Sequence, residues 1–202
     1  SMDTSDSIPL EETLEALGEL VKQGKVRQIG LSNETPWGTM KYLELAETKS
    51  LPRVASIQNA YNLVNRGFEI GLSEVAMHEQ VGLLAYSPLA QGTLTGKYLG
   101  GQMPQGSRLA LFGDGPLMMR YKGDKTQQAI EMYVNLAKKY EIDPAQLAIQ
   151  FCNIQPFVTS TIIGATTMEQ LKTCIDSVDL DITKEIINEI RSIHKEIPNP
   201  AP

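Results

Sequence analysis

The sequence is poor in the residues that cross-link chains or bind metals. Its 202 residues include two cysteines, Cys152 and Cys174, and two histidines, His78 and His194. Two cysteines are too few for a disulfide scaffold, and they favour a reducing compartment, the cytoplasm. The cysteines and histidines do not follow the spacing of a metal site, so we predict no metal.

Long apolar runs and an excess of positive charge are also missing. No uninterrupted apolar run approaches the roughly 20 residues that cross a bilayer, and the polar, acidic beginning lacks the pattern of a signal peptide. Lysine and arginine number 18 against 24 aspartates and glutamates, a formal charge of −6. This balance disfavours a broad nucleic-acid-binding surface, so we expect neither a nucleic-acid nor a membrane partner.

The rest of the composition is typical of a folded domain. Hydrophobic residues make up 42% of the chain and charged residues 21%, which is enough apolar material for a sizeable core. Ser1 before Met2 looks like the remnant of a removed tag. We therefore expect a flexible start over residues 1–7 and a folded unit over residues 8–202.

Strands and helices are predicted to alternate along the chain. Apolar runs predict strands at 26–31, 53–58, 81–86 and 159–163. Apolar residues three and four apart predict helices at 10–23, 35–48, 68–79, 126–140, 143–154, 166–177 and 183–195. Capping boxes are predicted at Asp143 with Gln146 and at Thr166 with Glu169. This alternation predicts an α/β fold with parallel, buried strands, interrupted by a long Gly/Pro-rich loop at 99–125.

Familiar catalytic motifs are missing, and polar residues gather where the predicted strands end. There is no Walker loop, no G-x-S-x-G and no G-x-G-x-x-G after a strand. Asn33 and Gln58 have amides suited to a carboxamide ligand, and Tyr86 has a ring that can stack on a planar heterocycle. Both amides equally suit plain turns. The helix after Thr166 offers backbone N–H groups to an anion.

The segment from Ser87 to Tyr98, SPLAQGTLTGKY, is the most specific of these features. Gly92 and Gly96 allow the backbone to approach a ligand closely, and Lys97 adds a cation suited to phosphate. The alternative reading is a glycine-rich loop with a solvated lysine.

Four segments resemble the aldo-keto reductase family, in order and at suitable intervals: GKVRQIGLSNE (24–34), SIQNAYNLVNR (56–66), LLAYSPLAQGTLTGKY (83–98) and IIGATTMEQL (162–171). The sequence is most similar to a Tas-like branch related to potassium-channel β subunits. The resemblance implies a (β/α)8 fold of the TIM-barrel type, of which this chain holds the C-terminal half, strands 5–8 with their helices. It also implies NADPH as cofactor and a small aldehyde or ketone as substrate.

The resemblance implies cofactor contacts at fifteen positions. Those matching the nicotinamide carboxamide are Ser32, Asn33 and Gln58, and Tyr86 matches the stacking aromatic. Those along the pyrophosphate are Ser87, Leu89, Gln91, Gly92, Leu94 and Lys97, with Arg108 near the adenosine. Those around the 2′-phosphate and adenine are Gly164, Thr166, Thr167 and Gln170. Family members often carry Glu-Asn where this chain has Thr173-Cys174, which leaves the adenine contact there open.

The family's catalytic tetrad has no counterpart in this sequence. Its reaction uses an aspartate, a tyrosine acid, a lysine that lowers the pKa of the tyrosine, and a histidine, because hydride transfer needs a matched proton donor. Tyr42 and Tyr61 do not lie in the required motif. We therefore assign no catalytic residue and expect this chain alone to be inactive as a reductase.

Three interpretations follow from the missing tetrad. The chain is a fragment of a full reductase, or a half-barrel that self-associates through two open strand edges and an apolar inner face, or a non-catalytic NADPH-binding regulatory subunit. Trp37 and the 99–125 loop are expected to border the carbonyl pocket. The preference for NADP over NAD rests on the resemblance alone.

Overall fold

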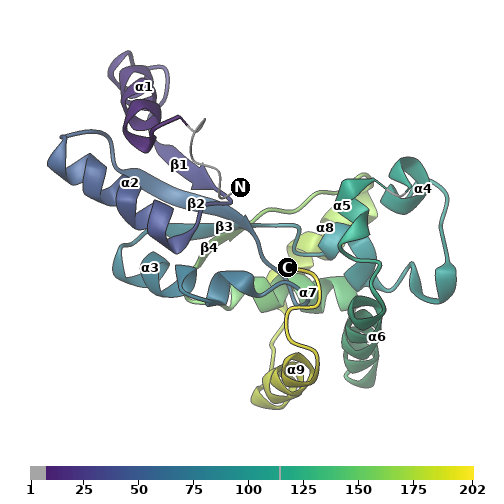
Figure 1. The fold of residues 1–202 in the computed structure, drawn as a ribbon. Helices are drawn as coiled ribbons and strands as arrows, with labels where there is room; N and C mark the ends of the chain where they lie inside the picture. Colours follow the sequence, from purple (N-terminus) through teal and green to yellow (C-terminus); the bar gives the residue numbers. More distant parts are fainter. Residues whose placement is uncertain (1–7, 114) are drawn as a thin grey trace.

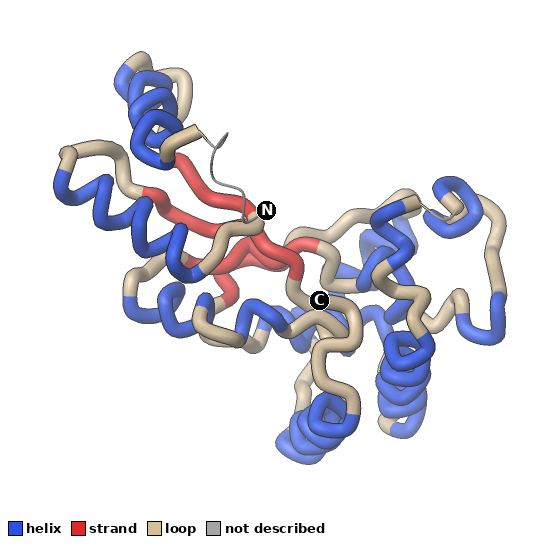
Figure 2. Tube along the Cα trace, in the orientation of Figure 1, coloured by secondary structure: helices blue, strands red, loops and turns tan. Residues whose placement is uncertain are grey.

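The structure is a computed structural model that describes residues 8–113 and 115–202. The expectation for residues 1–7 lies outside the described residues. Four parallel strands form one sheet in the order β1-β2-β3-β4, drawn red in Figure 2. The strands are β1 (Ile29–Ser32), β2 (Val54–Ala60), β3 (Gly82–Tyr86) and β4 (Val158–Thr161). The predicted α/β class with parallel strands is confirmed.

Helices connect the strands (Figure 1). The α-helices are α1 (Leu10–Lys22), α2 (Pro36–Thr48), α3 (Leu72–His78), α4 (Arg108–Phe112), α5 (Pro116–Met119), α6 (Asp124–Lys139), α7 (Pro144–Asn153), α8 (Met168–Asp176) and α9 (Lys184–Glu196). Short 3-10 turns are η1 (Gly67–Glu69), η2 (Ala90–Thr95), η3 (Leu99–Gly101) and η4 (Ser177–Asp179). α1, α2 and α3 pack in chain order, α7 packs on β4 and α8, and α6 packs on α9.

The strand bounds differ from the predicted ones by up to three residues, most at the start of β1. β1 begins at Ile29 rather than at residue 26, and β4 ends at Thr161 rather than at residue 163. Both lie at the edges of the sheet and pair with one neighbour each, so their apolar flanks lack a second ladder to extend them. The 99–125 segment, predicted as irregular, contains α4 and α5. Within the described residues, no helix is long and apolar enough to cross a membrane.

Side-chain caps mark the starts of α2, α4, α7, α8 and α9, with two corrections to the predicted capping boxes. Thr35 accepts a hydrogen bond from the Gly38 N–H at 3.0 Å, with proline at the first helical position, as expected. α8 is capped by Thr167, not Thr166: a threonine also stands three residues before Gln170, and the Gln170 N–H donates to the Thr167 Oγ1 at 3.2 Å. The predicted box of Thr166 with Glu169 is therefore wrong.

The other predicted capping box, Asp143 with Gln146, is only half formed. Asp143 caps α7 by accepting from the Ala145 N–H at 2.7 Å. The Gln146 side chain donates to the Thr173 carbonyl at 3.4 Å instead of returning to the cap. The Gln146 side chain therefore bonds to α8, against which α7 packs, and does not complete the capping box.

The two faces of the sheet differ sharply in chemistry. Paired residues of parallel strands share a face, and Leu31, Ile57 and Leu83 pair in register. Ile57 and Leu83 are fully buried in the core. The opposite face carries the row Ser32, Gln58, Leu84 and Ser160, and the row Gly30, Ser56 and Gly82. Because strand side chains alternate, the face opposite the core carries mostly small or polar residues, with Leu84 as an apolar exception, and differs from the apolar face expected.

A half-buried ion pair lies where the β2–α3 connection meets α9. Arg66 donates to both carboxylate oxygens of Glu69 at 2.6 and 2.8 Å, and the Tyr61 hydroxyl donates to the same carboxylate at 2.6 Å. The Arg66 guanidinium also stacks over the Phe151 ring at 5.3 Å. His194 of α9 interacts electrostatically with this pair and has its Nδ1 buried. The cluster joins the β2 loop to the C-terminal helix.

The pH dependence of stability tests this cluster. Burial, and next the Arg66 guanidinium, lower the pKa of His194 from its ordinary 6.5, so the folded chain favours the neutral imidazole. Because the unfolded chain takes up the proton more readily, the free energy of unfolding should fall as the pH drops below about 6.5. His194→Gln should flatten this part of the profile, measured by urea unfolding between about pH 8 and about pH 5.

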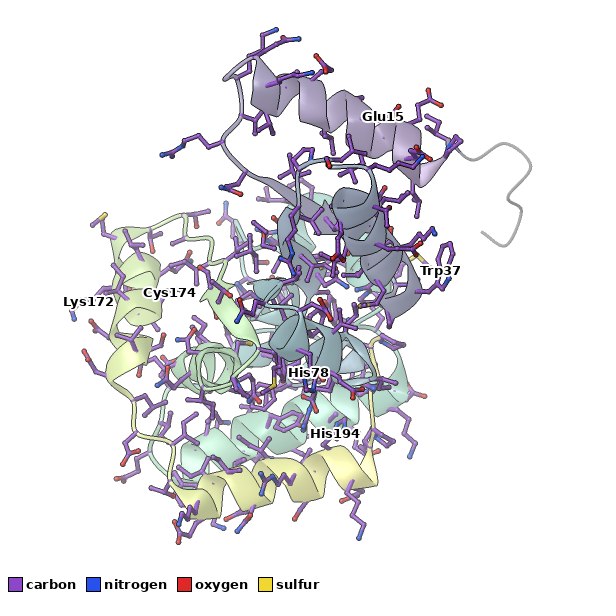
Figure 3. All side chains as sticks on the ribbon, turned by 90° about the vertical axis from the view of Figure 1, so that its left-hand side faces the viewer. Glu15, Trp37, His78, Lys172, Cys174 and His194 are labelled. Carbon is purple, nitrogen blue, oxygen red and sulfur yellow. The ribbon has the colours of Figure 1, made fainter. Side chains whose placement is uncertain are left out.

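His78→Gln is the matched control, since His78 lies exposed at the end of α3 (Figure 3). It should keep the wild-type profile. Glu69 contributes to stability in a more acid pH range. Burial tends to raise its pKa, but hydrogen bonds from Arg66 and Tyr61 lower the pKa below the ordinary 4.5. Its contribution is present above that value and is lost at more acid pH. A His194→Gln profile as steep as that of the wild type near pH 6 would contradict the assignment.

Candidate functional site

The C-terminal ends of all four strands lie along one side of the sheet because the strands run parallel, and this side is the edge that carries the candidate site. The Tyr86 hydroxyl, at the end of β3, donates to the Asn33 Oδ1 at 2.9 Å. The Asn33 backbone N–H donates to the Asn59 Oδ1 at 2.8 Å and to the Gln58 carbonyl at 3.1 Å. The Ser32 hydroxyl also donates to the Gln58 carbonyl, at 3.1 Å. The predicted carboxamide-binding residues therefore form one hydrogen-bonded group with the predicted stacking tyrosine.

The segment after β3 has an unusual backbone. Ser87, Ala90 and Gln91 have φ angles of +54°, +49° and +59°, and Gly92 has +91°. Residues other than glycine rarely adopt this left-handed region, and each costs of order 1 kcal/mol or more. Three such residues within five positions concentrate strain in the segment that the sequence singled out for cofactor binding, which is where functional sites commonly store it.

A chain of side-chain hydrogen bonds runs along this segment. Gln91 donates through its Nε2 to the Ser87 hydroxyl at 3.0 Å, and Arg108 donates to the Gln91 Oε1 at 2.6 Å. Arg108 also lies beside Gly164, where a Cβ would stand 3.9 Å from its Nη2. Arg108, the first residue of α4, therefore links the end of β3 to the connection between β4 and α8.

Lys97 lies against the same segment. A Cβ built on Gly92 would stand 3.0 Å from the Lys97 Nζ, so the glycine leaves room for the ammonium group. The Nζ also lies 5.2 Å from the centroid of the Tyr98 ring. Two cations, Lys97 and Arg108, thus flank the left-handed backbone, an arrangement suited to an anionic ligand.

The remaining predicted residues are placed differently. Thr166, Thr167 and Gln170 build the cap of α8, where the Gln170 Oε1 accepts from the Thr166 N–H at 2.9 Å. Their hydrogen bonds run within this cap. Leu94 is buried in the core, and Leu89 packs against the core, so their side chains serve packing.

Two contributors were missed by the sequence analysis. Asn62 is fully buried, and its Nδ2 donates to the Ser87 carbonyl at 3.0 Å. Tyr121 is 2% exposed, and its hydroxyl interacts with the Asn62 side chain and lies near Tyr86. Burial raises the pKa of Tyr121. Asn62 lies inside a family-like segment, so attention to every polar residue there could have found it. Tyr121 lies in the 99–125 interruption, where no pattern points to it.

Other parts of the molecule offer little chemistry. Across residues 8–113 and 115–202, no group of three or more histidine, cysteine, aspartate or glutamate residues could hold a metal ion. Both cysteines are buried thiols, and burial raises the pKa of Cys152. A surface hollow of about 750 Å³ lies between α1 and Ser50–Pro52, before the start of β2 and so away from the strand ends. Its rim includes Glu15 (Figure 3).

The glycine of the left-handed segment gives a direct test. Gly92→Ala and Gly101→Ala both place a Cβ on a left-handed residue, which should lower the free energy of unfolding by about 1–2 kcal/mol each. The contact with Lys97 exists only at Gly92, since nothing lies within 4 Å of a Cβ at Gly101. If urea unfolding gives similar losses of free energy for the two variants, the Lys97 side chain has moved away from the added Cβ at position 92. A Gly92→Ala chain as stable as the wild type would contradict the geometry.

Comparison with known proteins places this arrangement in a family. The model described as "Aldo/keto reductase family" matches residues 2–195. Protein tas of Escherichia coli strain K12 is 50% identical over 200 residues, which cover 99% of this chain and 57% of that protein. L-glyceraldehyde 3-phosphate reductase of the same strain is 33% identical over 177 residues, covering 86% of this chain and 51% of that protein.

A third relative is named as a channel subunit rather than as a reductase. The probable voltage-gated potassium channel subunit beta of Oryza sativa subsp. japonica is 30% identical over 193 residues, 94% of this chain and 59% of that protein. The chain thus spans little more than half the length of these relatives. The predicted likeness to a Tas-like branch related to channel β subunits is confirmed, and the chain belongs to the aldo/keto reductase family, whose fold is of the TIM-barrel type.

Proposed function

We propose that this chain binds NADPH along the edge formed by its strand ends and takes part in the reduction of aldehydes and ketones. The supporting observation is the continuous set of contacts from Asn33 through Tyr86 and Ser87 to Gln91 and Arg108. It joins amides, a ring and a cation at one edge of the sheet. A bound nicotinamide cofactor supplies the hydride for such a reduction.

The residues present fit the nicotinamide end of such a cofactor. Asn33 uses its Oδ1 to accept from Tyr86, which leaves its amide donor for a ligand oxygen. The exposed Gln58 side chain offers both a donor and an acceptor for a carboxamide. The Tyr86 ring is held by its hydroxyl on Asn33, so it presents a fixed face to a planar ring.

The cations suit the phosphates. Lys97 and Arg108 flank the left-handed backbone around Gly92, where the missing side chain allows close approach. The N-terminus of α8, behind Thr167, adds a favourable dipole for an anion. A 2′-phosphate would use this end, in keeping with a preference for NADPH over NADH.

We further propose that the chain provides the cofactor-binding part of the reductase and not its proton-transfer residues, with the 5–8 strands of the barrel represented by β1 to β4. No segment of the sequence carries the tetrad motifs of the resemblance. Without a positioned acid to protonate the developing alkoxide, hydride transfer to a carbonyl is slow.

A second candidate is a non-catalytic NADPH-binding regulatory subunit, favoured by the likeness to the rice channel subunit. A third, self-association, is favoured by the two edge strands, since β1 and β4 each pair with one neighbour in the sheet. In either case we expect a cytoplasmic protein that binds the cofactor.

NADPH titration of the 202-residue chain tests the binding proposal. We expect saturable binding, and we expect Tyr86→Ala to weaken it about tenfold, since stacking of a base on an aromatic ring contributes about 1–3 kcal/mol. Tyr86→Phe retains the ring and should bind within a few-fold of the wild type. Tyr140→Ala, at the C-cap of α6 and away from the strand ends, is the control and should leave the dissociation constant unchanged. Absence of NADPH binding by the wild type would contradict the proposal.

An activity assay tests the division of labour. We expect no oxidation of NADPH above background when the wild-type chain is mixed with a generic aldehyde, because the proton donor is missing. Turnover at the rate of a complete reductase would refute this. Light scattering on the same sample separates the candidates: a monodisperse NADPH-binding dimer supports self-association, and a monomer argues against it.

A further inference from the structure

Ser87 occupies a strained position that needs an external restraint. It follows the last residue of β3 with a φ of +54°. Its carbonyl accepts from the Asn62 Nδ2 at 3.0 Å and from the Ala90 N–H at 2.9 Å. Strained non-glycine residues persist only where their surroundings fix them, so these two bonds select the left-handed conformation.

Asn62 is itself held in one orientation. Its Oδ1 accepts from the N–H groups of Val64 and Asn65 at 3.0 and 2.9 Å. Because both N–H groups need an acceptor, the Asn62 Oδ1 must face them. The Nδ2 of the same amide must then face the Ser87 carbonyl. The turn formed by residues 62–65 is also held by the C-terminal segment, because the Ala201 N–H donates to the Val64 carbonyl at 3.1 Å. Asn62 therefore acts as a rigid donor.

Tyr121 closes the other side of this contact. It is buried, and its hydroxyl interacts with the Asn62 side chain. Its own carbonyl accepts from the Gln127 Nε2 at 2.5 Å, which fixes it at the start of α6. Asn62 is fully buried, and a buried hydrogen bond is costly to lose.

We propose that Asn62 is a positioning residue that sets the backbone of residues 87–92, and through it the cofactor affinity of this edge. The proposal rests on the proposed function for its second part. Asn62 reaches no ligand position itself. It acts through Ser87, whose hydroxyl accepts from Gln91, which in turn accepts from Arg108. Release of the Ser87 carbonyl would therefore disturb the segment as far as the cation that flanks it.

The test compares Asn62→Ser with Asn65→Ser in the full 202-residue chain. A serine at either position can still accept from the turn's N–H groups, but only the change at Asn62 removes the donor to Ser87. Asn65 is the matched control because it is a buried asparagine of the same turn, whose Oδ1 accepts from the Gly67 N–H at 3.3 Å.

Amide hydrogen exchange reads the backbone without any ligand. The N–H groups of Ala90 and Gly92 donate to the carbonyls of Ser87 and Leu89 at 2.9 and 2.8 Å. We expect both amides to exchange about tenfold faster in Asn62→Ser than in Asn65→Ser, as loss of one buried hydrogen bond predicts. Equal exchange in the two variants overturns the inference.

Ligand binding reads the consequence for the cofactor. We expect Asn62→Ser to weaken NADPH binding about tenfold and to leave binding of adenosine 2′-monophosphate within about twofold, since that ligand lacks the pyrophosphate that the 87–97 segment would hold. A merely structural role would weaken both ligands alike and overturns the inference. If Asn62→Ser yields no folded chain, the isosteric Asn62→Asp replaces it at pH 8, since it keeps the oxygen that the turn needs. If the wild type binds no NADPH, the proposed function fails, and the exchange comparison still decides whether Asn62 holds the segment.

Discussion

The parallel register of the four strands is the constraint on which the candidate site depends. Parallel pairing brings every strand end to one edge, and each connection must then leave the sheet and return over its helix-covered face. Ile57 and Leu83 fix that register from the core side, because a slip of one residue would turn their buried side chains outward. The polar edge is thus a consequence of apolar packing on the opposite side.

The chain leaves the sheet through left-handed residues at two of these ends. Asn33 follows β1 with a φ of +53°, and Ser87 follows β3 with +54°. Each is held by a side chain from another strand end, Tyr86 for Asn33 and Asn62 for Ser87. Because neither residue is glycine, the conformation is selected by these contacts rather than by backbone freedom. The geometry of the strand ends therefore arises from interactions between different strands, β3 with β1 and β2 with β3.

Local patterns in the sequence predicted the parallel strands and most helices, because periodicity and caps are local. They failed where the outcome depends on a partner: β1 and β4 lost their flanks at the sheet edge, and Gln146 bonded to Thr173 instead of its own cap. The grouping of Asn33, Gln58 and Tyr86 was predicted from strand ends and family resemblance. Tyr121 was not, because 59 residues separate it from Asn62 and only the fold joins them.

The contacts that hold the strand ends run from β1 to β2, from β2 to β3, from β3 across to β1, and from β3 to α4. None of them spans the barrel that the family fold would close. The face opposite the core is lined by residues such as Ser32, Gln58 and Gly30, which tolerate water without large cost. A four-stranded sheet of this kind can therefore keep its ligand-binding edge in order by itself. That independence is the physical reason to expect that the chain can bind the proposed cofactor on its own.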